Sequence, residues 1–250
     1  VLILLAGGHG KRFKSLIPKQ FVNLGNYNLI EYFLSSLDPS IFNIVIISAS
    51  NKNTVTYLNS LKNQFSQHKI IFALSGKTRQ ESSKNSLIKL AKYKPSNVLI
   101  HDAARPLASN KLIRKIVRSL QKNNTVIPYI KYNGLSKIQY KSKKLINNNQ
   151  IINIQTPQGF KYKTILKAHK NTNLINVKDD SILIEEQKLK LKYLKGENTN
   201  LKITFKEDID FFNKVKKKEY KSGIGYDIHK INLSSKKKLR LCGVKIDHPP

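Results

Sequence analysis

Glycines and cationic side chains stand together near the start of the sequence. Gly7, Gly8 and Gly10 follow the first apolar run, and Arg12 and Lys19 come shortly after them. Glycines at the end of a strand let backbone amides approach a phosphate closely and form a concave anion site. Two cations beside such a turn suit a polyphosphate, because they neutralise its charge. The alternative interpretation is a basic surface loop that follows a buried strand.

Two familiar phosphate-binding motifs do not fit this stretch. A Walker A loop would need a glycine where Leu5 stands and a serine or threonine where Arg12 stands. A dinucleotide-binding fingerprint would need a third glycine where Phe13 stands. The sequence therefore supports neither a P-loop ATPase nor a Rossmann dehydrogenase, and it leaves an anion site of another kind.

Two more polar segments belong to the same edge of the predicted fold. HDAARP (101–106) ends an apolar run, and its Asp102 suits a ribose hydroxyl or a magnesium ion, or else caps the turn that follows. GKTRQESS (76–83) opens a predicted helix and offers polar groups that can read a base. We expect both segments beside the glycine turn, because the carboxyl ends of parallel strands meet at one edge of a sheet.

The apolar runs predict the elements that position these segments. Short β-branched runs predict buried strands at 1–6, 43–48, 69–74 and 97–102. Apolar spacing and cap signals, such as Ser109-Asn110, predict helices at 29–37, 52–65, 80–93 and 109–122. This alternation indicates the α/β class, with a mainly parallel sheet between layers of helices.

The second half of the chain departs from that rhythm. Asn133-Gly134 is a strong hairpin signal, so residues 130–155 predict an antiparallel arm that projects from the sheet, a common dimerisation device. Beyond the arm we expect helices at 160–170, 180–188 and 207–218, a strand at 200–205, a linker at 216–222, and strands at 223–231 and 239–246. His9, His68 and His169 are interpreted as surface or loop residues rather than ligands.

Composition narrows the class of protein. The 250 residues carry a net charge of +31, but the lysines are scattered, and no zinc-finger, RRM or KH signature is present. We therefore attribute the charge to a lysine-rich composition that steers anionic substrates, with no specific nucleic acid as partner.

No apolar run in the sequence is long enough to span a membrane. The single Cys242 excludes an internal disulfide and fits the cytoplasm. The chain contains no Met, so we expect that its natural start is missing.

Six segments together carry a family resemblance. AGGHGKRF, PKQF, GKTRQES, HDAARP, TPQGF and NLKIT occur in the order and spacing of bacterial 2-C-methyl-D-erythritol 4-phosphate cytidylyltransferases, which the chain resembles over residues 1–218. The resemblance implies a three-layer, Rossmann-like nucleotidyltransferase fold with a projecting β-arm. GIGYDIHKI (223–231) resembles the start of 2-C-methyl-D-erythritol 2,4-cyclodiphosphate synthase. We therefore expect a bifunctional protein cut short, with a cytidylyltransferase domain at 1–218 and a linker and second-domain fragment at 219–250.

The resemblance implies transfer of a cytidylyl group from CTP to methylerythritol phosphate, with release of pyrophosphate and with Mg²⁺ bound to CTP. It implies that the glycine turn and Arg12 cradle the triphosphate, that Lys19 stabilises charge at the α-phosphorus, and that Lys202 lies at the reacting phosphate. Asp102 would bind the ribose. The nucleotide set that it implies is Ala6, Gly7, Gly8, Gly10, Gly76, Arg79, Ser82, Asp102 and Ala103.

The sequence departs from the family on the side of the second substrate. Asn148 stands where the family has a substrate-binding arginine, Asn133-Gly134 replaces an Asp-Thr pair, and Lys178 replaces a threonine. We predict that CTP binding is intact and that acceptor binding, which also involves Thr204, is weakened or rewired. Lys178 or Lys131 would then supply the missing cation.

In the second family, Asp227 and His229 match two of the three ligands of a divalent metal, usually zinc. Cyclase activity is not expected from this fragment, although the full-length protein would also be a lyase. The first domain is expected to form a homodimer through the 130–155 arm. Two alternatives remain: a related sugar-phosphate nucleotidyltransferase, which shares G-x-G-x-R and Pro-Lys, and a non-catalytic, basic polyanion-binding protein that keeps the fold.

Overall fold

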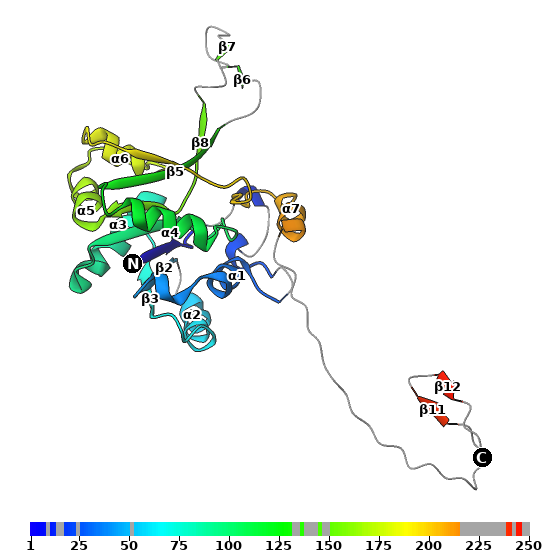
Figure 1. Cartoon of the computed structure of the whole chain (residues 1–250). Coiled ribbons are helices and arrows are strands. Elements are labelled where there is room, and N and C mark those ends of the chain that lie inside the picture. The colour runs from blue at the N-terminus through cyan, green and yellow to red at the C-terminus, as the bar shows by residue number, and fades with distance from the viewer. Residues whose placement is uncertain are drawn as a thin grey trace. The chain divides into compact units, whose positions relative to one another are not determined.

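The computed structural model describes residues 1–8, 11–13, 18–23, 26–50, 53–131, 136–137, 145–146, 151–215, 239–241 and 244–246. Contacts between Cα atoms divide the chain into two compact units, Val1–Lys216 and Lys217–Pro250. The first unit holds the central sheet and its helices (Figure 1). In the second unit, the described residues form a hairpin of β11 (Leu239–Leu241) and β12 (Val244–Ile246).

A mainly parallel sheet forms the centre of the first unit. Its strands lie in the order β10-β5-β9-β4-β1-β2-β3, and β8 pairs with β5 beside this path. Strands β1 to β4, and the β5–β10 pair, are parallel, whereas β9 runs antiparallel to both of its neighbours. The strands are β1 (Leu2–Leu5), β2 (Val45–Ala49), β3 (Ile70–Leu74), β4 (Asn97–Asp102), β5 (Thr125–Lys131), β8 (Ile152–Ile154), β9 (Gln158–Lys161) and β10 (Lys192–Lys195).

Helices cover both faces of the sheet, so the unit has three layers. The side chains of successive strand residues point to opposite faces. Leu2 and Leu4 of β1 accordingly pack with α1, α2 and α4, while Ile3 between them packs with α3, α5 and α6. The helices are α1 (Leu29–Ser36), α2 (Asn53–Gln64), α3 (Arg79–Leu90), α4 (Asn110–Ser119), α5 (Tyr162–Asn171), α6 (Ser181–Glu186) and α7 (Asp208–Val215). The predicted fold class is confirmed.

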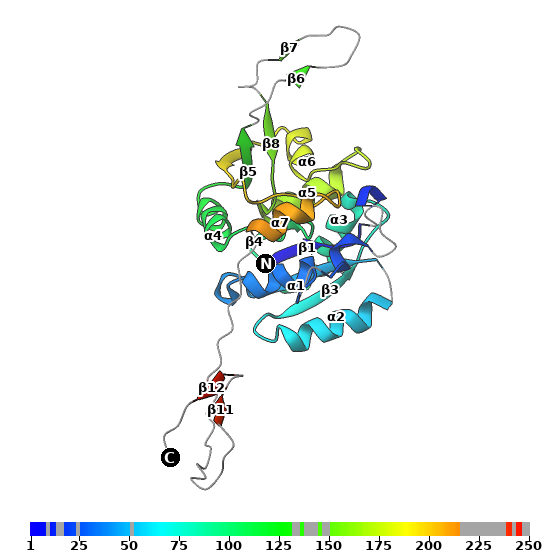
Figure 2. The same cartoon turned by 90° about the vertical axis from the view of Figure 1, so that its right-hand side faces the viewer.

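The antiparallel arm begins where β5 and β8 pair with each other and run out of the body of the unit (Figure 2). Farther along, β6 (Ser136–Lys137) pairs with β7 (Leu145–Ile146), also antiparallel. The extended, antiparallel character expected for 130–155 is therefore present in its described parts. The predicted turn at Asn133-Gly134 and the predicted linker at 216–222 lie outside the described residues.

The prediction of a strand at 200–205 is wrong. Residues 201–204 belong to no strand, although Ile203 is buried and its amide donates to the carbonyl of Ala104 at 2.8 Å. The segment alternates apolar and polar residues, but only Ile203 among them is buried, Phe205 is 49% exposed, and the segment does not form a ladder. The segment 239–246 is expected as one strand, but its described parts, 239–241 and 244–246, form two strands, β11 and β12, that pair antiparallel. Strands β9 and β10 are additions that the sequence patterns did not predict.

Two histidines expected at the surface or in loops are buried. His68 lies in a loop, as expected, but only 4% of it is exposed, and His169 on α5 is 1% exposed. The helix cap expected at Ser109 is confirmed, because its hydroxyl accepts a hydrogen bond from the amide of Leu112 at 3.1 Å.

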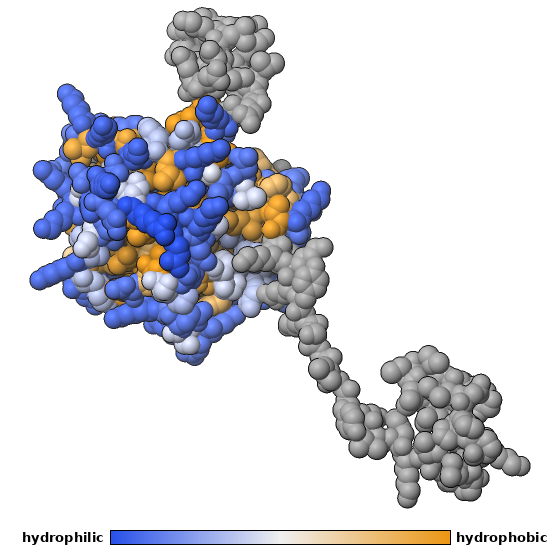
Figure 3. Space-filling view, in the orientation of Figure 1, coloured by the Kyte–Doolittle hydropathy of each residue, from blue (hydrophilic) through white to orange (hydrophobic). Residues whose placement is uncertain are grey.

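The outer surface is mostly hydrophilic on the face that Figure 3 shows, with apolar patches between the polar side chains. Among the described residues, no helix combines the length and the apolarity needed to cross a bilayer.

Gly159 on β9 allows α4 to pack closely on the sheet. A Cβ atom at this position would lie 2.6 Å from Ile116 Cγ2 and 2.9 Å from Leu120 Cδ1, and both of these side chains are fully buried. We predict that Gly159→Ala lowers the free energy of unfolding by about 1–3 kcal/mol, because overpacking forces neighbouring side chains to shift.

Denaturant unfolding measures this effect, with Gly8→Ala as the matched control. A Cβ atom at Gly8 would meet no atom within 4 Å, so its free energy of unfolding is expected to stay close to that of the wild type. Equal stability of the two variants would contradict the predicted packing.

Candidate active site

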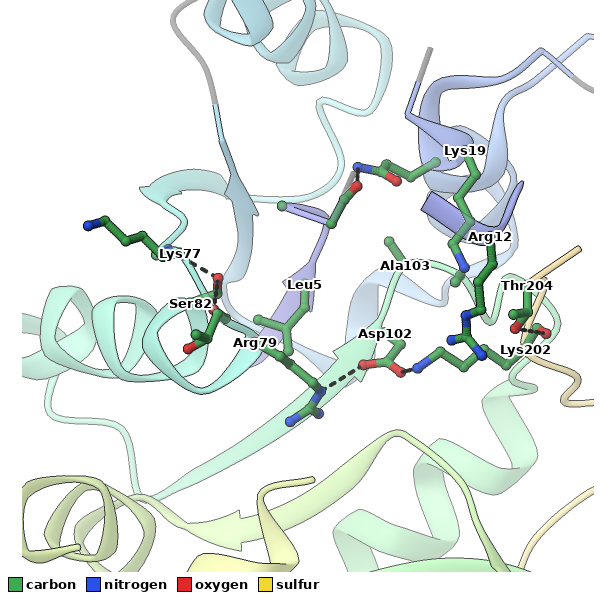
Figure 4. Close-up of a pocket in the computed structure, with 16 residues that line it drawn as sticks. Leu5, Arg12, Lys19, Lys77, Arg79, Ser82, Asp102, Ala103, Lys202 and Thr204 are labelled. Carbon is green, nitrogen blue, oxygen red and sulfur yellow. Dashed lines mark hydrogen bonds and ion pairs between the residues drawn. The ribbon is translucent and has the colours of Figure 1, made fainter. Parts of the chain in front are cut away.

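A cleft of about 400 Å³ lies where β1 and β4 end, at the carboxyl edge of the sheet. Four chain segments line it: the glycine turn after β1 with the following residues, the start of α3, the end of β4, and the segment 202–204. Figure 4 shows Arg79 and Lys202 approaching Asp102 from opposite sides, with Lys19 and Arg12 above Lys202 in this view. The polar segments expected at one sheet edge are therefore brought together.

Close backbone packing explains two of the glycines in the cleft. A Cβ atom on Gly7 would lie 2.4 Å from the Cβ atom of Ser75, which follows β3. On Gly76 it would lie 2.1 Å from the Cβ atom of Glu81. The loop before α3 folds back tightly, since Thr78 caps the helix at the amide of Glu81 and the Glu81 carboxylate accepts from the amide of Lys77.

Gln20 holds the glycine turn in place. Its side-chain amide donates to the carbonyl of Ala6 at 2.5 Å and to the carbonyl of Gly8 at 2.8 Å, and the residue is only 3% exposed. Ala6 is itself buried and is not one of the residues that line the cleft. Sequence analysis missed Gln20, although its place directly after Lys19 in Pro-Lys-Gln was a signal.

The Asp102 carboxylate connects two of the cations. Arg79 Nε donates to Oδ1 at 3.2 Å, and Lys202 Nζ donates to Oδ2 at 2.5 Å. Burial alone would raise the pKa of Asp102, but the charges of Arg79 and Lys202 outweigh burial and hold it well below its ordinary value. Asp102 is therefore ionised, and its carboxylate pairs with cations rather than capping the next turn.

Lys19 donates to the carbonyl of Ile203 at 2.5 Å, which places its ammonium beside the segment that carries Lys202. Burial, and next the positive charge of Lys202, lower the pKa of Lys19 to about 8. Among the described residues, no carboxylate forms an ion pair with Lys19 or Arg12. These two cations are thus available for an anionic ligand.

A second network fixes the HDAARP segment against Thr156. His101 Nδ1 accepts from the Thr156 hydroxyl at 2.9 Å, and that hydroxyl accepts from the amide of Asp102 at 3.1 Å. The other ring nitrogen donates to the carbonyl of Arg105 at 3.0 Å. Burial lowers the pKa of His101 to about 3, so the ring is neutral.

Arg105 extends this network to the segment before Lys202. Its guanidinium donates to the carbonyl of Asn200 at 2.7 Å and to that of Ile154, at the end of β8, at 3.2 Å. The HDAARP and TPQ segments therefore support the cleft mainly in an indirect way. They fix the position of Asp102 and of the backbone at 200–202.

Most of the residues singled out from the sequence line the cleft: Gly7, Gly8, Arg12, Lys19, Gly76, Arg79, Ser82, Asp102, Ala103, Lys202 and Thr204. Gly10, Asn148, Asp227 and His229 lie outside the described residues. Lys178 is exposed and is not one of the residues that line the cleft. The described part of the chain also contains no cluster of three or more His, Cys, Asp and Glu side chains that could hold a metal ion.

A family model described as 2-C-methyl-D-erythritol 4-phosphate cytidylyltransferase matches residues 1–214. The chain belongs to this family. It is 30% identical to the enzyme of that name from Thermotoga neapolitana over 87% of this chain and 96% of the relative. A solved structure, "4-diphosphocytidyl-2C-methyl-D-erythritolsynthase" from Anaerococcus prevotii, is 28% identical with a TM-score of 0.72, and the match covers 85% of this chain and 95% of that one.

The chain is also 39% identical to "Bifunctional enzyme IspD/IspF" from Pelagibacter ubique over 99% of its own length. It spans 64% of that relative's length. The similarity continues beyond the residues that match the family, into the second unit.

The lowered pKa of Lys19 predicts how the binding of an anion in the cleft depends on pH. Below its pKa of about 8 the side chain is charged, and above that value it is neutral. We predict that a nucleoside triphosphate that contacts Lys19 binds several-fold more weakly at about pH 9 than at about pH 7, because it loses a counter-charge while its own ionisation is largely complete by about pH 7.

Calorimetric titration with CTP measures this dependence, and Lys19→Arg is the matched variant because a guanidinium stays charged throughout the range. The affinity of the variant should change much less with pH. An equal loss of affinity in both proteins would show that Lys19 is not the titrating group.

Proposed function

We propose that the first unit transfers a cytidylyl group from CTP to 2-C-methyl-D-erythritol 4-phosphate and releases pyrophosphate. The observation that carries this proposal is the meeting of the glycine turn, five cationic side chains and Asp102 in one cleft. The cations are Arg12, Lys19, Lys77, Arg79 and Lys202, and Asp102 is the one carboxylate among the described lining residues. Membership of the cytidylyltransferase family supports this reaction and these substrates.

In the proposed reaction, an oxygen of the acceptor phosphate attacks the α-phosphorus of CTP. A bond from that oxygen to the α-phosphorus forms, the bond from the α-phosphorus to the bridging oxygen breaks, and the electron pair leaves with pyrophosphate. Because both reactants are phosphates, positioning and charge neutralisation are the main contributions that a protein can make. No covalent intermediate with the protein is required.

The cations have different tasks in this proposal. Arg12 and Lys19, which form no ion pair within the described residues, would hold the triphosphate and neutralise the charge that develops as pyrophosphate leaves. Lys202, which approaches Asp102 from the side opposite Arg79, would bind the acceptor phosphate. Asp102 would bind the ribose through lone pairs that its two cations leave available, and Gly76 and Ser82 would bind the base.

We propose that Mg²⁺ enters the cleft with CTP. The donor set fits a metal carried mainly by phosphate oxygens, because Asp102 is the single carboxylate among the described lining residues and both of its oxygens bind cations. Asp102 is therefore the residue that would contact the ion. When bound, Mg²⁺ neutralises phosphate charge and polarises the reacting phosphoryl group.

The acceptor side is assigned to Thr204 and Lys202, which both line the cleft. Lys178 is exposed outside it, and Lys131 lies exposed at the end of β5. In this proposal one of these lysines supplies the cation that Asn148 lacks, and the first unit forms a homodimer through the 130–155 arm.

For the second unit we propose a fragment of a cyclodiphosphate synthase, since the similarity to bifunctional relatives extends over 99% of the chain. Asp227 and His229 would each supply one donor atom to a divalent metal ion, and zinc is the ion with which to test this site. The complete second domain would carry the lyase activity.

Release of pyrophosphate tests the proposed transfer. With CTP, Mg²⁺ and methylerythritol phosphate, the wild type should release pyrophosphate only when the acceptor is present. Lys19→Ala should lower kcat/KM by about a hundredfold, because a preorganised cation at the developing charge is lost. Lys115→Ala, which removes an exposed lysine from α4, is the control and should match the wild type. Absence of acceptor-dependent release from the wild type would contradict the proposed function.

The role of Lys178 has its own test. If this lysine binds the acceptor phosphate, Lys178→Ala should raise the KM for methylerythritol phosphate about tenfold and leave the KM for CTP unchanged, since a charge-assisted contact is lost on one substrate only. Steady-state kinetics with each substrate varied in turn measures both constants. An unchanged acceptor KM would rule out Lys178 and leave Lys131 as the remaining candidate.

A further inference from the structure

A buried carboxylate lies behind the cleft, in the layer of helices that covers this face of the sheet. Asp180, directly before α6, has no exposed side-chain surface. Its Oδ1 accepts from His169 Nε2 at 2.9 Å, and its Oδ2 accepts from Arg79 Nη1 at 2.6 Å and from the Ser83 hydroxyl at 3.4 Å. Three helices, α3, α5 and α6, therefore meet at one carboxylate.

The ionisation of these groups follows from their contacts. Burial alone would raise the pKa of Asp180, but the charge of Arg79 and the hydrogen bond from His169 hold it below its ordinary value. Since a carboxylate only accepts hydrogen bonds, His169 must carry its proton on Nε2. His169 has no exposed side-chain surface either.

Arg79 joins this buried pair to the cleft. Its Nη1 contacts Asp180, its Nε contacts Asp102, and it is itself one of the residues that line the cleft. Asp102 in turn holds Lys202 at 2.5 Å. The result is an ordered chain of alternating partners, His169, Asp180, Arg79, Asp102 and Lys202, which begins inside α5 and ends at an ammonium in the cleft.

Two anchors restrict Arg79 far more than one would. An arginine bound only to Asp102 could follow that carboxylate through several rotamers, because its stem is long and flexible. With Nη1 held on the buried Asp180, the guanidinium is fixed, and Asp102 has a stationary donor on Oδ1. Sites that are held by a supporting shell of hydrogen bonds lose less free energy to reorganisation when the substrate reacts.

We propose that His169 and Asp180 are positioning residues for the cleft: they fix the Arg79 guanidinium, which fixes the Asp102 carboxylate and, through it, the Lys202 ammonium. The kinetic part of this inference rests on the proposed cytidylyl transfer, in which Asp102 and Lys202 contact the substrates. The structural part concerns the position of Lys202 and does not depend on which substrate binds.

Two readouts separate positioning from simple stabilisation of the fold. The first is kcat, measured at a temperature at which thermal unfolding shows every variant to be folded. The second is the rate at which acetic anhydride labels Lys202, followed by mass spectrometry with Lys115 as an internal reference. The contact with Asp102 holds the Lys202 nitrogen in a hydrogen bond and restricts its approach to the reagent, and the Lys202 side chain is 38% exposed, so the reagent can reach it once the contact loosens.

His169→Phe keeps a ring but removes the Nε2 donor, and His169→Gln retains an amide donor in its place. His68→Phe is the matched control, because His68, in the loop between α2 and β3, is also buried and its Nε2 hydrogen-bonds to the carbonyl of Leu34 on α1 at 3.3 Å. Asp180→Asn is a second test variant that preserves shape, and it serves if His169→Phe does not fold.

We expect His169→Phe to lower kcat about tenfold, and to raise the labelling rate of Lys202 at least about threefold. His169→Gln and His68→Phe should stay within about twofold of the wild type in both readouts. The proposal is overturned if His169→Phe and Asp180→Asn leave Lys202 labelling and kcat no different from those of His68→Phe. If the wild type shows no transfer, the proposed function fails, and the labelling rates alone still decide whether His169 and Asp180 position Lys202.

Discussion

The Asp102 carboxylate at the end of β4 is the contact on which the arrangement of the cleft depends. It binds Arg79 from the start of α3 and Lys202 from a segment one hundred positions further along the chain. A buried carboxylate without partners would be costly, so the two cations and the backbone of the HDAARP segment must be in place together. The end of β4, the loop before α3 and the 200–204 segment are thereby held at one sheet edge.

This contact also divides the positive charge of the cleft into two parts. Arg79 and Lys202 are neutralised by Asp102, and Arg79 by Asp180 as well, whereas Arg12 and Lys19 form no ion pair within the described residues. The first pair of cations builds the site and the second pair is available for an anion. Burial and the neighbouring Lys202 ammonium lower the pKa of Lys19 to about 8. A bound triphosphate would stabilise the charged form of Lys19. The charge pattern therefore agrees with the proposed reaction of a nucleoside triphosphate.

Local sequence patterns predicted much of this molecule, and they failed where distant contacts decide. The first four strands, their helices and the polar segments after β1 and β4 followed from apolar runs, glycines and caps. The prediction of a strand at 200–205 failed because Ile203 is buried as a single residue, with its amide on the carbonyl of Ala104, and the segment pairs with no strand. Gln20 was visible in Pro-Lys-Gln, but only the fold shows that it holds the carbonyls of the glycine turn.

His169 lies four residues after Ile165 on the buried face of α5, so helical spacing could have predicted that it is buried. Its connection to Asp102 could not have been predicted, since Asp180 and Arg79 are far apart in sequence.

The most direct test of the central claim is ³¹P NMR of the whole chain with CTP, Mg²⁺ and methylerythritol phosphate. Cytidylyl transfer predicts that the β-phosphorus signal of CTP disappears while a pyrophosphate singlet and the two coupled doublets of a diphosphate diester grow together. A spectrum in which CDP and inorganic phosphate form instead, or in which CTP persists as it does without protein, would contradict transfer at the α-phosphorus.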